Sequence, residues 1–303
     1  MFNKMIAGLL PHFPKRLIWS FSKKYIAGAE LKDAIRVSKE LNSQNIMITV
    51  DVLGEFITNL SQADETRDEY LEVIEEFEKN KIDGNYSVKP TSFGLLLDEE
   101  KAYQNIRAVV AKAAEYGNFV RIDMEDSPCT DLEITLYRRL KGEFPTNVGL
   151  VVQAYMRRTF SDIKGLMDIH SDIAPTNYRL CKGIYIEPEE VAYKDFDEVN
   201  EHFLKDLEYM FQNGIYAGIA THDEFLVEGA FKLIEKYNMP KEGYEFQMLY
   251  GVTPKLRQRV IDAGHRIRVY VPFGKDWFGY STRRLKENPN ILSHAMKSII
   301  SRG

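Results

Sequence analysis

The chain has 303 residues, 44% of them hydrophobic, a formal net charge of −5 and two cysteines. This length is enough for one large domain with a full core, and the negative charge does not favour general nucleic-acid binding. Cys129 and Cys181 provide neither a disulfide framework nor metal-ligand spacing. We therefore expect a protein of a reducing, intracellular compartment, with no metal and no nucleic-acid partner.

Residues 1–44 are predicted to form an N-terminal helical arm. The first 29 residues carry five basic side chains and no acidic one, and Pro11 and Pro14 interrupt their apolar part. This interruption argues against a signal peptide, and no run of about 18 apolar residues predicts a transmembrane helix. The arm could contact an anionic membrane surface or pack on the domain, and both alternatives stay open. We expect a cytoplasmic protein, with peripheral contact to the inner face of the cell membrane as one alternative.

From residue 30 onward, short apolar, β-branched runs alternate with longer charged segments of helical spacing. The predicted strands are Asn45–Val52, Asn85–Lys89, Phe119–Met124, Val148–Tyr155, Tyr178–Cys181, Ile215–Thr221, Glu245–Leu249 and Arg266–Val271. The predicted helices between and after them are Glu65–Asn80, Glu99–Tyr116, Asp131–Lys141, Ser161–Ser171, Phe196–Asn213, Glu224–Tyr237, Pro254–Ala263, a motif helix around Tyr280 and Ile291–Ile300.

This alternation predicts an α/β fold with parallel strands and crossover helices. Eight such units favour a single (β/α)8 TIM-type barrel over residues 45–303. An open doubly wound sheet is the alternative, but no GxGxxG motif follows an early strand.

Polar side chains follow almost every predicted strand at its carboxyl end, where the active site of such a barrel lies. Their number favours a ligand site, because burying them unpaired would be costly. Lys89 and Asp123 could instead form a structural ion pair, and His222 could be a core histidine preceding a helix cap at Asp223. The strand-end candidates are Asp51, Glu55, Lys89, Asp123, Glu125, Asp126, Gln153, Tyr155, Arg179, Lys182, Thr221, His222, Asp223, Gln247 and Tyr250.

The motif helix over residues 276–288 carries Tyr280, Arg283, Arg284 and Glu287 on one face. Two guanidinium groups side by side suit a carboxylate or a phosphate, because each donates paired hydrogen bonds in a fixed geometry. A solvated surface helix with an internal Arg–Glu pair is the alternative for this pattern taken alone.

Taken together, these residues resemble the proline dehydrogenase family of flavin enzymes, over about Asp51 to Asn288. The small monofunctional bacterial form is the better match, since no aldehyde dehydrogenase half follows. The resemblance implies a distorted (β/α)8 barrel with the motif helix over its mouth. It is carried by Arg121–Ser127, Val152–Tyr155, Arg179–Tyr185, Ala220–His222, Phe246–Leu249 and Tyr280–Asn288.

The resemblance also implies FAD-dependent oxidation of L-proline to 1-pyrroline-5-carboxylate, by hydride transfer to flavin N5, with electrons passed to a quinone. Asp123 and Arg179 would be catalytic, with Arg179 near N5, and Glu55 would pair with Arg283 as a gate. The implied substrate residues are Lys89, Tyr185, Tyr280, Arg283 and Arg284. The implied FAD residues are Met124, Gln153, Arg179, Lys182, Gly183, Ile184, Thr221, His222 and Glu287.

One position departs from the family pattern. Ile184 stands where the family usually has Ala, beside Tyr185, and a larger side chain there could reshape the substrate pocket. A 4-hydroxyproline dehydrogenase and a barrel that only binds a small carboxylate are the alternative functions.

Overall fold

The computed structural model describes residue 19, residues 22–278 and residues 280–281. Within these residues, eight parallel strands form a closed barrel in sequence order, and β8 pairs with β1 to complete it. The strands are β1 Met47–Val52, β2 Gly84–Val88, β3 Val120–Ile122, β4 Val148–Gln153, β5 Asn177–Cys181, β6 Tyr216–Ala220, β7 Tyr244–Leu249 and β8 Ile267–Phe273. The predicted barrel is confirmed, and an open doubly wound sheet is excluded.

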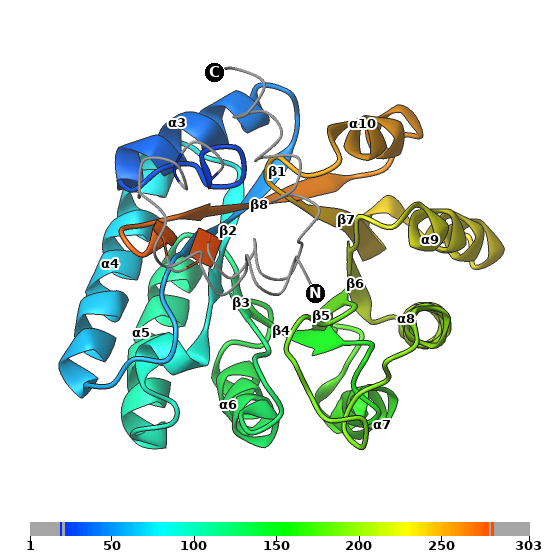
Figure 1. Cartoon of the computed structure of the whole chain (residues 1–303), viewed down its shortest axis with the longest axis horizontal. Helices are drawn as coiled ribbons and strands as arrows, with labels where there is room; N and C mark the ends of the chain where they lie inside the picture. Colours follow the sequence, from blue (N-terminus) through cyan, green and yellow to red (C-terminus); the bar gives the residue numbers. More distant parts are fainter. Residues whose placement is uncertain (1–18, 20–21, 279, 282–303) are drawn as a thin grey trace, which may run out of the picture.

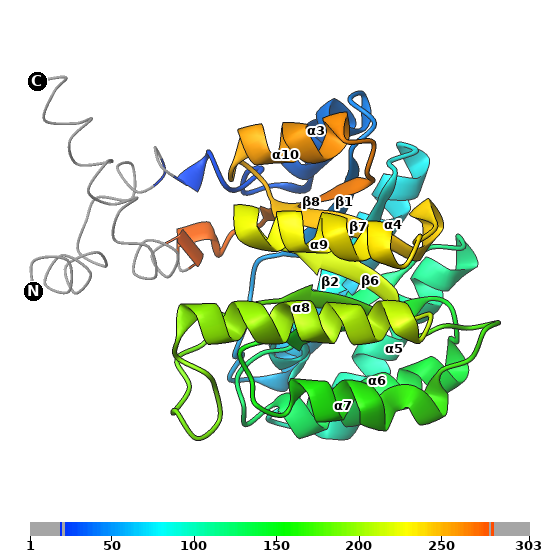
Figure 2. The same ribbon diagram turned by 90° about the vertical axis from the view of Figure 1, so that its right-hand side faces the viewer.

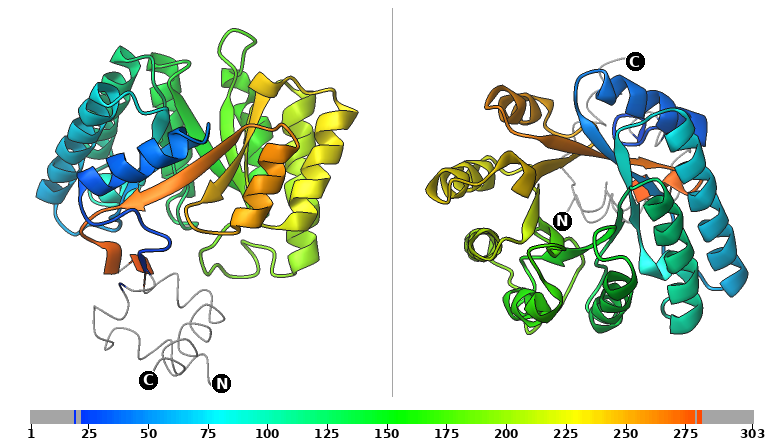
Figure 3. Two further views of the ribbon diagram at one scale, coloured as in Figure 1. Left: turned by 90° about the horizontal axis from the view of Figure 1, so that it is seen from above. Right: turned by 180° about the vertical axis from the view of Figure 1, so that it is seen from behind.

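A layer of helices surrounds the barrel (Figures 1 and 3). These helices are α3 Leu31–Asn42, α4 Leu60–Lys79, α5 Glu99–Glu115, α6 Thr130–Glu143, α7 Thr159–Gly165, α8 Phe196–Gln212, α9 Glu224–Lys236 and α10 Pro254–Asp262. Short 3-10 turns lie at η2 Pro90–Phe93, η3 Leu166–Ile169 and η4 Lys241–Gly243. Figure 2 shows α7, α8 and α9 one above another on the outside of the barrel.

Helix α4 begins at Leu60, five residues before the predicted start at Glu65. The reason is a capping box: Asn59 Oδ1 accepts a hydrogen bond from the Ser61 N–H at 3.0 Å, and Gln62 Oε1 accepts one from the Asn59 N–H at 3.2 Å. These bonds satisfy backbone donors that would otherwise lack partners at the helix start. The predicted start was therefore wrong because it followed the charge pattern and overlooked the cap.

Two further boundaries differ from their predictions. Strand β3 pairs only over Val120–Ile122, although the Asp123 N–H still donates to the Val88 carbonyl at 2.9 Å. The helix predicted over Ser161–Ser171 is α7 followed by the 3-10 turn η3.

The hydrophobic core lies between the strands and the helices, as β8 illustrates. Val269 and Val271 are fully buried among apolar side chains of this core. Arg268 and Tyr270, at the alternate positions, point into the barrel, where Arg268 bonds to Glu245 on β7 and Tyr270 bonds to Asp123, which follows β3. The alternation of the strand thus places polar side chains in the barrel interior, where they lead to the site.

Helix α3 lies against β1 and β8 in the helical layer. Ile26, Leu53 and Tyr280 form a small separate apolar cluster, against which Trp277 packs. The motif helix beyond Ser281 and the predicted helix Ile291–Ile300 lie outside the described residues. The division of the chain at residue 44 stays a prediction. Within the described ranges, no helix is both long and apolar enough to cross a bilayer.

Candidate active site

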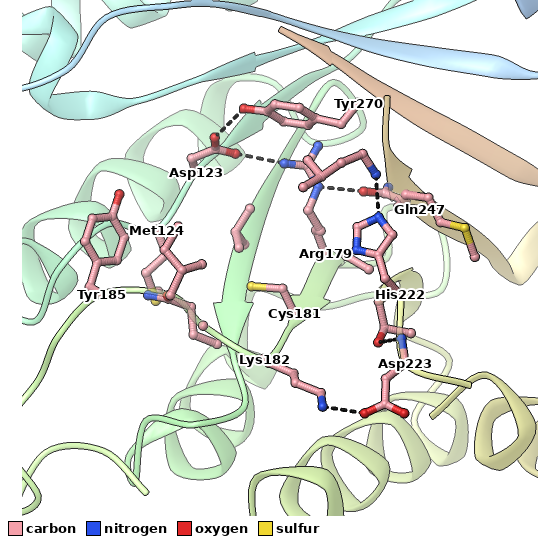
Figure 4. A pocket seen from close by; sticks show the side chains of 18 of the residues that line it. Asp123, Met124, Arg179, Cys181, Lys182, Tyr185, His222, Asp223, Gln247 and Tyr270 are labelled. Carbon is pink, nitrogen blue, oxygen red and sulfur yellow. Dashed lines mark hydrogen bonds and ion pairs between the residues drawn. The ribbon is translucent and has the colours of Figure 1, made fainter. Parts of the chain in front are cut away.

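A cavity of 710 Å³ opens at the carboxyl ends of the strands, within the range of about 300–1,000 Å³ usual for small-molecule sites (Figure 4). Every described residue to which the family resemblance gives a role lines it: Glu55, Lys89, Asp123, Met124, Gln153, Arg179, Lys182, Gly183, Ile184, Tyr185, Thr221, His222 and Tyr280. Five other strand-end candidates are not among the lining residues: Asp51, Glu125, Asp126, Tyr155 and Tyr250. Arg283, Arg284 and Glu287 lie outside the described residues.

Lys89, which follows β2, is held by groups on β1 and β8 and by the residue that follows β3. Its Nζ lies 2.8 Å from Asp51 Oδ1 and 3.5 Å from Asp123 Oδ2, and it donates to the Tyr270 hydroxyl at 3.2 Å. Asp51 is fully buried, and burial raises its pKa to about 6 against the opposing charge of Lys89. Burial alone would lower the pKa of Lys89, but the carboxylate of Asp51 raises it well above its ordinary value. Lys89 therefore remains a fixed cation at the cavity wall.

Arg179 on β5 is held at two points of its guanidinium group. Its Nη1 donates to Asp123 Oδ1 at 2.9 Å and to Ser87 Oγ at 3.0 Å, and its Nε donates to Gln247 Oε1 at 2.6 Å. Asp123 also accepts hydrogen bonds from Ser87 Oγ at 2.5 Å and from the Tyr270 hydroxyl at 3.1 Å. Asp123 thus joins Lys89 and Arg179 into one network, as Figure 4 shows for its contacts with Arg179 and Tyr270.

The segment after β5 places a cation and a glycine on the cavity wall. Lys182 forms an ion pair with Asp223 at 2.6 Å, and its Nζ lies 3.7 Å from the ring centre of Phe196. Gly183 has φ +108°, and a Cβ there would lie 2.1 Å from Tyr155 Cδ1. Glycine is therefore required at 183, both for this conformation and for the close approach of its backbone to the ring.

His222 follows β6, and its ring nitrogen Nε2 accepts a hydrogen bond from the Leu249 N–H at 2.8 Å. Burial lowers the pKa of His222 to about 4. The ring is therefore neutral, with its proton on Nδ1. Asp223 caps α9 by accepting from the Phe225 N–H, which confirms that sequence hypothesis.

The remaining wall combines an amide, thioether and aromatic groups. Gln153 is buried and donates from Nε2 to the Glu125 carbonyl at 2.9 Å. Met124 and Tyr280 are buried and contribute apolar surface to the cavity wall. Burial raises the pKa of Tyr185, whose side chain therefore stays a neutral phenol. Ile184 is 42% exposed at the cavity rim.

Tyr270, which contacts both Lys89 and Asp123, was not among the residues predicted from the sequence. The alternation of apolar and polar residues in β8 could have identified it as an inward-facing side chain. The partnership of Asp51 with Lys89 was also missed, although Asp51 was a strand-end candidate. No cluster of three or more His, Cys, Asp or Glu side chains able to hold a metal ion occurs within residues 19, 22–278 and 280–281.

Buried cations and carboxylates at the carboxyl ends of the strands define this molecule as a TIM-barrel enzyme with a site for a small polar substrate. The family model described as proline dehydrogenase matches residues 34–297. Proline dehydrogenase 1 of Bacillus subtilis subsp. natto is 34% identical over 93% of this chain and 91% of its own. Proline dehydrogenase of Deinococcus radiodurans is 32% identical over 94% of this chain and 92% of its own. The chain belongs to the proline dehydrogenase family.

A solved structure agrees in fold. Proline utilization A from Bdellovibrio bacteriovorus, inactivated by N-propargylglycine, matches with a TM-score of 0.82 and 27% identity over 89% of this chain. The chain spans about a third of that longer protein, 33% of its length. The protein is accordingly an oxidoreductase that oxidises proline in proline catabolism, and its family is generally flavin-dependent.

Proposed function

We propose that the cavity binds FAD together with L-proline and that the product is 1-pyrroline-5-carboxylate. The observation that carries the proposal is the convergence of Lys89, Asp123 and Arg179 on one cavity wall. FAD, when bound, supplies the acceptor for the hydride, and with it the two electrons, removed from proline. The protein's own residues bind, orient and shield the reactants.

The cavity wall fits a flavin nucleotide in its chemistry. The ammonium group of Lys182 suits a phosphate-bearing chain, and Gly183 beside it adds no side chain to the cavity wall, while Met124 provides an apolar surface for a flat ring. Arg179, fixed at two points, supplies a positive charge. Gln153, Ile184, Thr221, His222 and Glu287 complete the proposed FAD site.

Lys89 offers a fixed positive charge to the substrate carboxylate, and Asp51 and Asp123 keep its ammonium group in place. Tyr185 and Tyr280 would pack against the pyrrolidine ring. Arg283 and Arg284 would clamp the carboxylate, and Glu55 would pair with Arg283 as a gate.

Proline must lose an amine proton before it can lose a hydride. A positively charged pocket lowers the pKa of a bound ammonium group, so Lys89 and Arg179 would favour the neutral amine. We assign no residue as the base for this proton.

The decisive experiment is an anaerobic absorbance spectrum of the FAD-reconstituted protein before and after addition of L-proline. Bleaching of the flavin band by proline is the expected result. A band that stays oxidised with proline but bleaches with 4-hydroxyproline would change the substrate, and Ile184 beside Tyr185 would then be the first residue to exchange. A protein that takes up no flavin would contradict the proposal.

The substrate clamp has its own test. Replacing Arg283 or Arg284 with Ala should raise KM for proline by roughly 10-fold or more, because a charged hydrogen bond contributes about 1.5–3 kcal/mol. Flavin binding should be retained. Arg259→Ala on α10, where the side chain pairs with Glu228, is the surface control. An unchanged KM in both clamp variants would remove the assignment.

We further propose that a membrane quinone accepts the electrons and that the N-terminal arm provides peripheral membrane contact. A larger fraction of the full chain than of a variant lacking residues 1–29 should sediment with anionic liposomes. Equal fractions would contradict membrane contact by the arm and favour an arm that packs on the domain.

A further inference from the structure

A line of buried polar side chains runs through the barrel interior to Arg179. Arg268 on β8 donates from Nε to Glu245 Oε1 at 2.6 Å and from Nη2 to Glu245 Oε2 at 3.1 Å. Gln247 donates from Nε2 to Glu245 Oε1 at 2.7 Å, and its Oε1 accepts from Arg179 Nε at 2.6 Å. All four side chains are buried. Arg179 is therefore connected to a charged pair beyond the cavity wall.

The charge of Glu245 determines which way the Gln247 amide points. Burial alone would raise the pKa of Glu245, but the charge and hydrogen bonds of Arg268 lower it to about 2. The ionised carboxylate only accepts hydrogen bonds, so the amide NH₂ must face it and the amide oxygen must face Arg179. A flipped amide would set oxygen against carboxylate and NH₂ against the Arg179 N–H.

Gly218 on β6 leaves the space that this amide occupies. A Cβ at 218 would lie 2.6 Å from Gln247 Nε2 and 3.5 Å from the Arg179 Cα. By register, Gly218 lies between Arg179 on β5 and Glu245 on β7. A side chain there would push the amide away from its present partners without removing any polar group.

We propose that Gln247 and Glu245 are positioning residues that orient Arg179 toward the cofactor. Held at Nε by Gln247 and at Nη1 by Asp123, the planar guanidinium cannot rotate about its long axis. The edge that Arg179 presents to the cavity is fixed in consequence. This inference rests on the proposed function, in which Arg179 lies beside the bound flavin.

The main test is Gln247→Met, which keeps the side-chain volume and removes both hydrogen bonds. Misplacing a catalytic group by about 1 Å costs on the order of 100-fold in rate, so flavin reduction by proline should slow by roughly 10- to 100-fold. KM should change far less than kcat. The midpoint potential of the bound flavin, measured by dye titration without proline, should become more negative, because the positive charge beside it is less well placed.

Asn177→Leu is the matched control. Asn177 Oδ1 accepts from Arg121 Nη2, also at 2.6 Å, and Arg121 is a buried guanidinium that is not among the cavity-lining residues in the described part of the chain. This variant should lower the unfolding midpoint but leave the flavin potential and reduction rate unchanged. A wild-type rate and potential in Gln247→Met would overturn the inference, as would equal shifts in both variants.

Gly218→Ala covers the case in which Gln247→Met does not fold. Its added methyl group meets the far end of the Gln247 side chain, which can move aside, so the protein should still fold although the displaced amide lowers its stability, and the potential and rate should shift in the same direction. A folded Gly218→Ala protein with wild-type values of both would overturn the inference. If proline fails to bleach the wild-type flavin, the proposed function fails, and the dye titration still tests the positioning of Arg179 separately.

Discussion

Replacing His222 with Gln should remove a pH dependence from the stability of the fold. The folded ring must stay neutral, because its Nε2 accepts the Leu249 N–H and burial lowers its pKa to about 4. In the unfolded chain the pKa of histidine is about 6.5. Between about pH 4 and 6.5 the unfolded state therefore binds more protons, so this contribution to stability is lost as the pH falls through that window.

The magnitude follows from these two pKa values. At about pH 5 the difference in protonation costs the wild-type fold about 2 kcal/mol, and at about pH 7.5 it costs under about 0.1 kcal/mol. The amide oxygen of the introduced glutamine can accept the same backbone hydrogen bond at every pH, so the variant lacks this cost.

The assay is urea unfolding of cofactor-free wild type and His222→Gln at about pH 5 and pH 7.5. The wild type should lose about 2 kcal/mol more than the variant on acidification. Asp51 and Glu125, whose pKa values burial raises to about 6 and about 7, act in the opposite direction, but they are present in both proteins and cancel in the comparison. Equal losses in the two proteins would refute a buried neutral His222.

Two other changes test the cavity wall. Gly183→Ala should abolish flavin uptake and lower the unfolding free energy by more than about 1 kcal/mol, measured by absorbance and by urea titration, because the new Cβ has no space at φ +108°. Normal flavin binding by Gly183→Ala would contradict the requirement for glycine at this position. Lys89→Met should lower the unfolding free energy by about 3–5 kcal/mol, because it leaves Asp51 buried without its cation. Adding Asp51→Asn to this variant should recover most of the lost unfolding free energy. The control is Lys101→Met, which breaks the surface pair with Asp64 and should lower the unfolding free energy by under about 1 kcal/mol. An equally small loss of unfolding free energy in Lys89→Met would show that the pair of Lys89 with Asp51 contributes little.

The sequence predicted the barrel because a strand buried on both faces is an almost continuous apolar run, and such runs stand out between charged helices. It also located the cavity, since polar groups such as Lys182 and His222 follow strands β5 and β6, and the carboxyl ends of parallel strands meet on one side.

The partners of these groups were beyond the sequence. Lys89 was expected beside Asp123, but its shortest contact is with Asp51, because the depth of each side chain in the barrel depends on strand stagger. The link from Glu245 through Gln247 to Arg179 depends on the empty space above Gly218, which no residue pattern encodes. The roles of Arg283, Arg284 and Glu287 stay predictions.

The pairing of β8 with β1 has a consequence for how the enzyme folds. Tyr270 and Lys89 are 181 positions apart in the chain, and their contact forms only when the last strand meets the first. Contacts of such long sequence separation carry a high entropic cost before they stabilise anything, which makes folding slow. During synthesis the edge of β1 stays unpaired until β8 has been made, so the emerging chain is most prone to aggregation just before the barrel closes. The charged network at the cavity wall would accordingly be among the last parts of the molecule to assemble.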